Sequence, residues 1–244
     1  MKRVGAALLV ASLSFPLSAY HVDPSYNRDR TGLAVVHPDG RVSISPKAEE
    51  ARPALSLAKL YLGYYVLYNG TKAEKKQVEE MIASSDDGIA STLDAKYPEA
   101  IDQIAEDFDL KQTARGVSWG KSLTSARDLA TFIASIVWDP AAKPLFAGME
   151  KQTAVASDGF IQGFGTARLK RVKGSKMGWS DDRESATGSV SWGEIGKETW
   201  AVAALTYGTA YENTVDTNVG INQVNDGDAP QHPALDGGFL PVWK

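Results

Sequence analysis

The chain is predicted to be an α+β domain in which an antiparallel sheet of about five strands is flanked by helices. Two strand-like segments, residues 31–36 and 41–45, precede a long stretch of helical periodicity, and three further strand-like segments follow it. The length of 244 residues fits one such domain, and the apolar and charged fractions are those of a globular protein.

The first two strands are expected to form a hairpin, because residues 37–40 read His-Pro-Asp-Gly, a turn-rich tetrapeptide. A helix is expected to begin near Ser56, since apolar side chains follow at helical spacing until Asn69 and Gly70 end the run.

The helical region is expected to cover residues 70–160 approximately. Residues 71–74 form a capping box that opens a helix with Val78, Met81 and Ile82 on its buried side. Helical periodicity also predicts helices over residues 87–95, 98–108 and 124–137. The last of these is expected to start at Thr124 as its N-cap.

The C-terminal part is expected to supply three strands and then an irregular tail. Segments 166–172, 188–195 and 199–207 alternate or run apolar over strand-like lengths. Residues 212–244 are rich in Asn, Asp, Gly and Pro and show no clear period. The acidic side chains of this tail match no calcium-loop pattern, so we interpret it as solvated loop.

The N-terminus reads as an export signal. Two basic residues precede an apolar stretch up to Phe15, and a small-residue cleavage site predicts a cut after Ala19. A buried N-terminal helix is the alternative. We therefore expect residues 1–19 to be a signal peptide, residues 20–244 to be a single exported domain, and no membrane span to remain after cleavage. The expected location is periplasmic, extracellular or associated with the cell envelope.

Composition excludes several classes of function. A formal net charge of −4 gives no basic surface for nucleic acid. The absence of cysteine excludes disulfides, thiol catalysis and cysteine-based metal sites. The three histidines have no metal-ligand spacing, so we expect neither a metal nor another cofactor.

The first of three short motifs is Ser-x-x-Lys at Ser56 and Lys59. On a helix, residues i and i+3 share one face, so the amine can reach the hydroxyl and take its proton. Burial favours the neutral amine that this step requires. A second Ser-x-x-Lys occurs at Ser118 and Lys121, but it lies in a glycine-broken segment with no helix expected after it.

The second motif is Ser85-Asp86-Asp87, expected in a loop between two helices. A hydroxyl there can pass a proton to a leaving group. Helix capping explains the same residue types without any chemistry, and it is the alternative interpretation.

The third motif is Lys176-Met177-Gly178, between two expected strands. The lysine can hold an acidic group, and glycine lets a ligand approach the backbone. The backbone N–H groups of Trp179 and Ser56 would then form an oxyanion hole. An ordinary hairpin with an exposed lysine is the alternative.

In their order along the chain, these motifs resemble those of class A β-lactamases and D-Ala-D-Ala peptidases. The similar segments are residues 53–61, 81–91, 124–130 and 172–180. The resemblance implies that Ser56 is the acyl-accepting nucleophile, Lys59 its base and Ser85 the proton relay. It implies that Asp87 orients the site and that Lys176 holds a substrate carboxylate electrostatically.

The same resemblance implies that Met177, Gly178, Trp179 and Ser180 border the substrate. Among the tryptophans, only Trp179 is expected in the cleft; the others are expected as core or turn anchors.

Some positions depart from the family pattern. Asp87 stands in place of an amide, and Met177 in place of a hydroxyl. The short interval between Ser56 and Ser85 indicates a trimmed helical subdomain. No glutamate can be assigned as the base that activates water, because Glu99 and Glu106 read as solvated helix positions.

The resemblance implies an exported serine acyl-transfer hydrolase that acts through an acyl-Ser56 intermediate on a cell-wall peptide or a related amide or ester. The alternative is a catalytically impaired relative that binds a cell-wall fragment or an envelope partner. The expected ligand is a peptidoglycan-derived peptide or a β-lactam-like small molecule, and the expected oligomeric state is a monomer.

Overall fold

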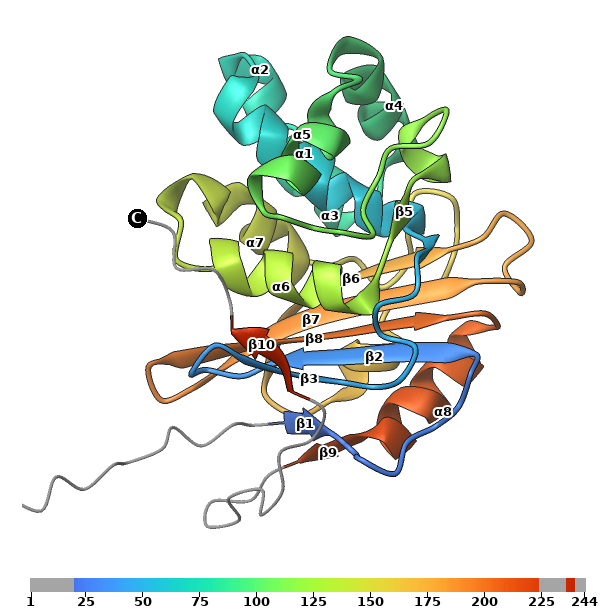
Figure 1. The fold of residues 1–244 in the computed structure, drawn as a ribbon. Helices are drawn as coiled ribbons and strands as arrows, with labels where there is room; N and C mark the ends of the chain where they lie inside the picture. The colour runs from blue at the N-terminus through green and yellow to red at the C-terminus, as the bar shows by residue number, and fades with distance from the viewer. Residues whose placement is uncertain (1–19, 224–235, 240–244) are drawn as a thin grey trace, which may run out of the picture.

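An antiparallel sheet forms the centre of the computed structural model, which describes residues 20–223 and 236–239. Its strand order is β10-β3-β2-β8-β7-β6, so four of the expected strands are present as β2, β3, β7 and β8, and the short β10 extends the edge at β3 (Figure 1). The strands are β2 (Thr31–Val36), β3 (Arg41–Ile44), β6 (Val172–Trp179), β7 (Thr187–Ile195), β8 (Glu198–Thr206) and β10 (Asp236–Phe239).

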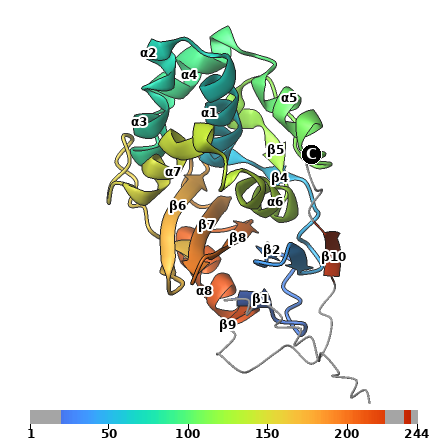
Figure 2. The ribbon, with the colours of Figure 1, turned by 90° about the vertical axis from the view of Figure 1, so that its left-hand side faces the viewer.

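Helices cover both faces of this sheet (Figure 2). One face carries four helices whose apolar side chains share a core with those of the sheet. They are α1 (Ala58–Asn69), α3 (Val78–Ala83), α6 (Ala126–Ile136) and α7 (Lys143–Glu150). A small helical subdomain adds α2 (Lys72–Lys75), α4 (Asp87–Lys96) and α5 (Ala100–Asp107). The opposite face carries α8 (Ala210–Gly220) and the strand pair β1 (Tyr20–Val22) and β9 (Ile221–Gln223). A separate pair, β4 (Arg52–Pro53) and β5 (Leu123–Thr124), lies beside the start of α1.

The two-sided cover explains why the strands read as continuous apolar runs. In β2, Ala34 and Val36 face the core under the helices, whereas Leu33 and Val35 face a second core that includes Trp200. A strand buried on both faces has no polar alternation. The α+β class predicted from the sequence is confirmed.

Two predicted elements differ from the structure. The helix expected from the capping box is divided: Thr71 and Glu74 form the box as predicted, but they cap only the short α2, and α3 follows separately. The N-cap of α6 is Ser125, whose hydroxyl accepts from Asp128 N–H, because Thr124 is the last residue of β5.

The strand predicted over residues 166–172 is wrong. A 3-10 helix, η4 (Gly165–Arg168), occupies its first three residues, and β6 starts only at Val172. Gly165 has a φ of +58° and Arg171 a φ of +58°, so the backbone turns at both ends of the segment. Lys176, Met177 and Gly178 consequently lie within a strand and not between two.

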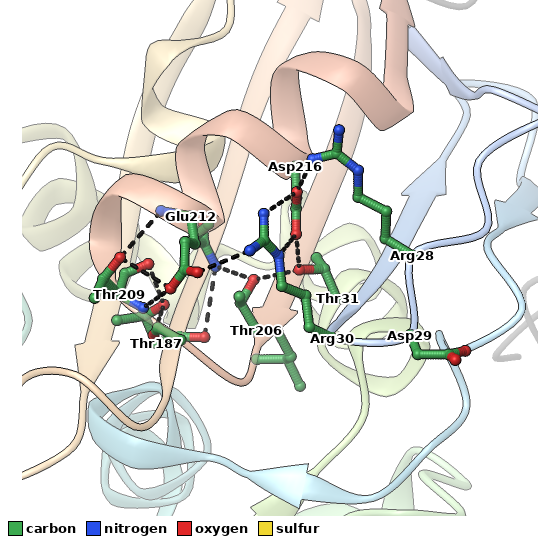
Figure 3. A network of polar contacts seen from close by, with 12 residues as sticks. Arg28, Asp29, Arg30, Thr31, Thr187, Thr206, Thr209, Glu212 and Asp216 are labelled. Atoms are coloured by element: carbon green, nitrogen blue, oxygen red, sulfur yellow. Dashed lines mark hydrogen bonds and ion pairs between the residues drawn. The ribbon is translucent and has the colours of Figure 1, made fainter.

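The prediction of an irregular tail from residue 212 onward is also wrong for the residues of this segment that the structure describes as helix α8. Helix α8 begins at Thr209 with a capping box to Glu212. Two of its polar side chains, Asn213 and Asp216, are buried and hydrogen-bonded. Asp216 accepts hydrogen bonds from Arg30 and Thr31, as Figure 3 shows. Composition suggested a solvated loop because a buried polar network and a loop use the same residue types.

The predicted signal peptide, residues 1–19, lies outside the described residues. Among the helices that the structure describes, none has both the length and the apolar character needed to cross a membrane.

Candidate active site

The Ser56 hydroxyl borders a cavity of about 590 Å³ at the start of α1. Ser56 belongs to the 3-10 helix η1 (Leu55–Leu57), which leads into α1, and its side chain is largely buried. Leu55 before it has a φ of +55°, a conformation that costs a leucine about 1 kcal/mol or more. Backbone strain of this kind next to a reactive side chain is typical of active sites.

Lys59 lies one turn further along, on the same face of the helix. Its Nζ is 2.9 Å from Ser56 Oγ, and the side chain is completely buried. The amine also donates to the carbonyl and hydroxyl oxygens of Ser85, at 2.8 and 3.1 Å. The predicted serine–lysine pair is therefore within hydrogen-bonding distance.

Ser85 connects Lys59 to the third motif. It lies in the turn between α3 and α4 with a φ of +58°, and its hydroxyl accepts a hydrogen bond from Lys176 Nζ at 2.8 Å. The Lys176 amine also donates to the Met177 carbonyl at 2.7 Å and is completely buried. One hydroxyl thus lies between two buried amines that are far apart in the sequence.

Burial lowers the pKa of both amines. For Lys59, loss of hydration is the largest effect and outweighs the hydrogen bond and charge of Asp87, so its pKa falls below the ordinary value. For Lys176, loss of hydration and repulsion by Lys59 together lower the pKa well below the ordinary value. Both shifts favour the neutral amine that can accept a proton from a serine.

Asp87 is the first residue of α4 and borders the cavity with 61% of its side chain exposed. Its Oδ1 is 2.5 Å from Lys59 Nζ, an ion pair that favours the charged amine. The Trp119 ring lies against the same amine, with its centroid 4.5 Å from Nζ. Lys59 is therefore enclosed by a serine, a carboxylate and an indole.

The start of η1 packs directly against β6. A Cβ on Gly178 would lie 2.8 Å from the Leu55 Cβ and 2.9 Å from the Ser56 nitrogen, so only glycine permits this approach. Ser180 N–H bonds to the Ala186 carbonyl across the hairpin to β7. In an antiparallel pair, the N–H groups of successive residues point alternately toward and away from the neighbouring strand. Because Ser180 N–H points toward β7, the Trp179 N–H points away from it, to the free edge of the sheet, where Ser56 lies. That these two N–H groups bind one oxyanion stays a prediction.

The four residues predicted to border the substrate do not all line the cavity. Trp179 and Ser180 border the cavity, and the Ser180 hydroxyl donates to Asp182 at 2.5 Å. Gly178 packs against Leu55 and Ser56 and is not among the residues that line the cavity. Met177 is completely buried beside the Gln152 amide and does not border the cavity. Its side chain fills the core where a hydroxyl was expected to face a ligand.

Lys176 is completely buried and is not among the residues that line the cavity. Its amine donates to the Ser85 hydroxyl and to the Met177 carbonyl. The expectation that it holds a substrate carboxylate electrostatically stays a prediction.

The sequence did not reveal several residues around the cavity. Trp119, expected as a core or turn anchor, borders it, and so do Asp158 and Arg183. Trp119 is part of the second Ser-x-x-Lys motif, whose Lys121 amine lies 3.6 Å from Asp181. No local pattern marks these residues, because loops distant in sequence bring them together.

The cavity offers no glutamate as a base for water. Glu99 and Glu106 are exposed on α5 as expected, and the cavity-lining acids among the described residues are all aspartates: Asp87, Asp158, Asp181 and Asp182. In the same part of the chain, no three His, Asp or Glu side chains gather as a metal site.

Comparison with known proteins identifies the fold. No model of a known protein family and no curated protein sequence matches the chain. Among solved structures, penicillin-binding protein D2 from Listeria monocytogenes, in its ampicillin-bound form, is 17% identical with a TM-score of 0.62, covering 81% of this chain and 97% of its own.

Two further structures agree. A D-alanyl-D-alanine carboxypeptidase from Mycobacterium tuberculosis is 15% identical with a TM-score of 0.59, covering 83% of this chain and 94% of its own. A β-lactamase from Streptomyces albus G is 16% identical with a TM-score of 0.59, covering 78% and 93%. The chain therefore has the fold of the penicillin-binding proteins, D-alanyl-D-alanine carboxypeptidases and β-lactamases, with a sequence that diverges widely from theirs.

Proposed function

We propose that the chain is a serine acyl-transfer hydrolase that forms an acyl-Ser56 intermediate. The observation that carries this proposal is the hydrogen-bonded series Ser56, Lys59, Ser85 and Lys176, with both amines buried and shifted toward the neutral form. Helix capping explains the residue types of the Ser85 motif. It does not explain why two lysine amines are buried, at a cost in hydration, and donate hydrogen bonds to the same Ser85 hydroxyl.

In this proposal, neutral Lys59 takes the proton of Ser56 Oγ while that oxygen attacks a carbonyl carbon. The N–H groups of Ser56 and Trp179 bind the oxyanion of the tetrahedral intermediate. As the carbonyl re-forms, the bond to the leaving group breaks. The leaving group takes a proton through the Ser85 hydroxyl, which is replenished from a lysine ammonium. Water then releases the acyl group and restores the Ser56 hydroxyl.

For the substrate we propose a cell-wall peptide or a related amide or ester, processed by an exported monomer. Similarity of fold to a carboxypeptidase and to an ampicillin-bound penicillin-binding protein supports this class of substrate. Among the residues that the structure describes, no glutamate lines the cavity to activate water. We therefore expect the acyl-Ser56 intermediate formed with a β-lactam to be hydrolysed slowly.

A second candidate is a non-catalytic protein of the same fold that binds a cell-wall fragment or an envelope partner. The observation that favours it is the 2.5 Å ion pair between Lys59 and Asp87, since a charged lysine cannot act as a base.

Intact-mass analysis after incubation with a fluorescent penicillin and, separately, a fluorophosphonate distinguishes the two candidates. The hydrolase predicts one adduct with at least one probe, its loss in Ser56→Ala, and its retention in Ser118→Ala, which alters the other Ser-x-x-Lys motif. A penicillin adduct is expected to persist for hours. A folded protein that neither probe labels would establish the binding protein instead.

A further inference from the structure

A second cavity, of about 710 Å³, lies on the far side of the β6 edge from the Ser56 cleft. The segment after Gly159 forms one wall and the outer surface of α8 forms the other. Phe160 borders this groove and stacks on Trp179 of the cleft at 4.5 Å, and Arg183 borders both cavities. The groove is therefore next to the candidate active site but separate from its reactive groups.

The groove exposes large apolar side chains to solvent. Ile161 is 73% exposed and Tyr211 77% exposed, and both line it. Val155, 52% exposed, pairs with Ile161 through a β-bridge and continues the same surface. Single exposed apolar residues are common, but a contiguous group beside a cavity marks a binding surface.

The charge of the groove is opposite to that of the cleft. Arg168 and Arg183 border the groove, and no aspartate or glutamate does. Neither arginine forms an ion pair with a carboxylate in the part of the chain that the structure describes. Arg183 lies over the Phe160 ring at 5.6 Å, which holds its guanidinium beside the apolar surface.

We propose that this groove binds an amphipathic anion, a small carboxylic acid with an apolar body. The body would cover Phe160, Ile161 and Tyr211, which removes their exposed surface from water. The carboxylate would accept hydrogen bonds from Arg183 and Arg168, whose donors have no acidic partner in the described structure. This binding does not require that Ser56 be catalytic.

Calorimetric titration of the whole protein with decanoate, and with decyltrimethylammonium as a cation of the same chain length, tests the proposal. We expect saturable one-to-one binding of decanoate and at least about tenfold weaker binding of the cation. The double variant Ile161→Ser/Tyr211→Ser should weaken decanoate binding about tenfold or more through lost apolar contact. Arg183→Gln should weaken it and reduce its dependence on salt.

Matched controls are Trp138→Ser, an exposed apolar residue outside the groove, and Lys197→Gln, an exposed cation in the β7–β8 turn. Both should bind decanoate as the unaltered protein does. Equal binding of the two head groups, or unchanged binding in the double variant, would overturn the proposal. Fluorophosphonate labelling of the double variant reports on Ser56 separately, so failure of either proposal is recognised independently.

Discussion

At the scale of single residues, the Ser85 hydroxyl lies between two amines that are both withdrawn from water. Two buried ammonium groups around one hydroxyl repel each other, which adds to the cost of their lost hydration. Asp87 is the carboxylate that offsets this repulsion at Lys59. Among the carboxylates near the pair, Asp87 has the largest effect on the pKa of Lys59, so it is the first to test.

Asp87→Asn is expected to raise the rate of Ser56 labelling at neutral pH. Loss of the carboxylate removes an interaction that raises the Lys59 pKa, so the neutral amine is present at lower pH. The rising limb of the labelling rate should move to lower pH, with about tenfold faster labelling for each unit of pKa on that limb. Rates of fluorophosphonate labelling measured across pH 5–10 check this.

Asp181→Asn is the control, because Asp181 also borders the cavity but is almost fully exposed and pairs with Lys121. Its profile should match that of the unaltered protein. An Asp87→Asn profile that does not move would mean that the ion pair does not control the base.

At the scale of elements, the site depends on how closely η1 approaches β6. At Gly178 the sheet edge approaches the start of the helix so closely that an added Cβ would lie 2.9 Å from the Ser56 nitrogen. The proposed oxyanion hole of Ser56 and Trp179 N–H groups depends on this approach. In the proposed mechanism, η1 supplies the nucleophile and α1 its base, β6 supplies the buried Lys176, and the α3–α4 turn supplies the hydroxyl between the two amines.

Gly178→Ala is expected to reduce Ser56 labelling by about a hundredfold or more, the usual effect of losing an oxyanion donor. The added Cβ would push β6 away from η1 and separate the two N–H groups, at a stability cost of about 1–3 kcal/mol. Labelling rates and thermal unfolding, measured together, separate these effects.

Gly120→Ala is the matched control. Gly120 borders the same cavity, but a Cβ there meets nothing within 4 Å. It should retain both stability and labelling. If Gly178→Ala labelled as fast as Gly120→Ala, the oxyanion assignment would be wrong.

At the scale of the whole molecule, a buried ion-pair network joins β2 to α8 (Figure 3). The Asp216 side chain is fully buried and accepts from Arg30 at 2.6 and 2.8 Å and from Thr31 at 2.6 Å, and Arg28 also pairs with it. Burial raises the pKa of this carboxyl, but the hydrogen bonds outweigh burial and lower it to about 2. The network therefore fastens α8 to the sheet.

Asp216→Asn is expected to lower the free energy of unfolding at pH 7 by about 2–3 kcal/mol. The folded-state pKa lies below the unfolded value, so the stabilisation is complete above about pH 4 and is lost as pH falls toward 2. The difference between the two proteins should shrink over that range. Urea unfolding at pH 7, 4 and 3 measures it, with Asp181→Asn, a surface change expected within about 0.5 kcal/mol, as control. A difference that stays constant down to pH 3 would contradict the assignment.

Local patterns in the sequence determined most of the elements and the reactive pair. The β2–β3 hairpin, the long helix α1, the capping box at Thr71 and the closeness of Ser56 to Lys59 all follow from periods and spacings within a few residues. Such features depend only on neighbouring backbone and side chains.

Tertiary structure alone decided the rest. The sequence could not show that Trp119 faces Lys59, that the buried Lys176 amine reaches Ser85, or that Asp216 is buried in an ion-pair network. Each depends on contacts between segments far apart in the chain, and a polar residue has the same local signature whether it faces water or a buried partner. For that reason the motif order predicted the fold, whereas packing determined which side chains reach a ligand.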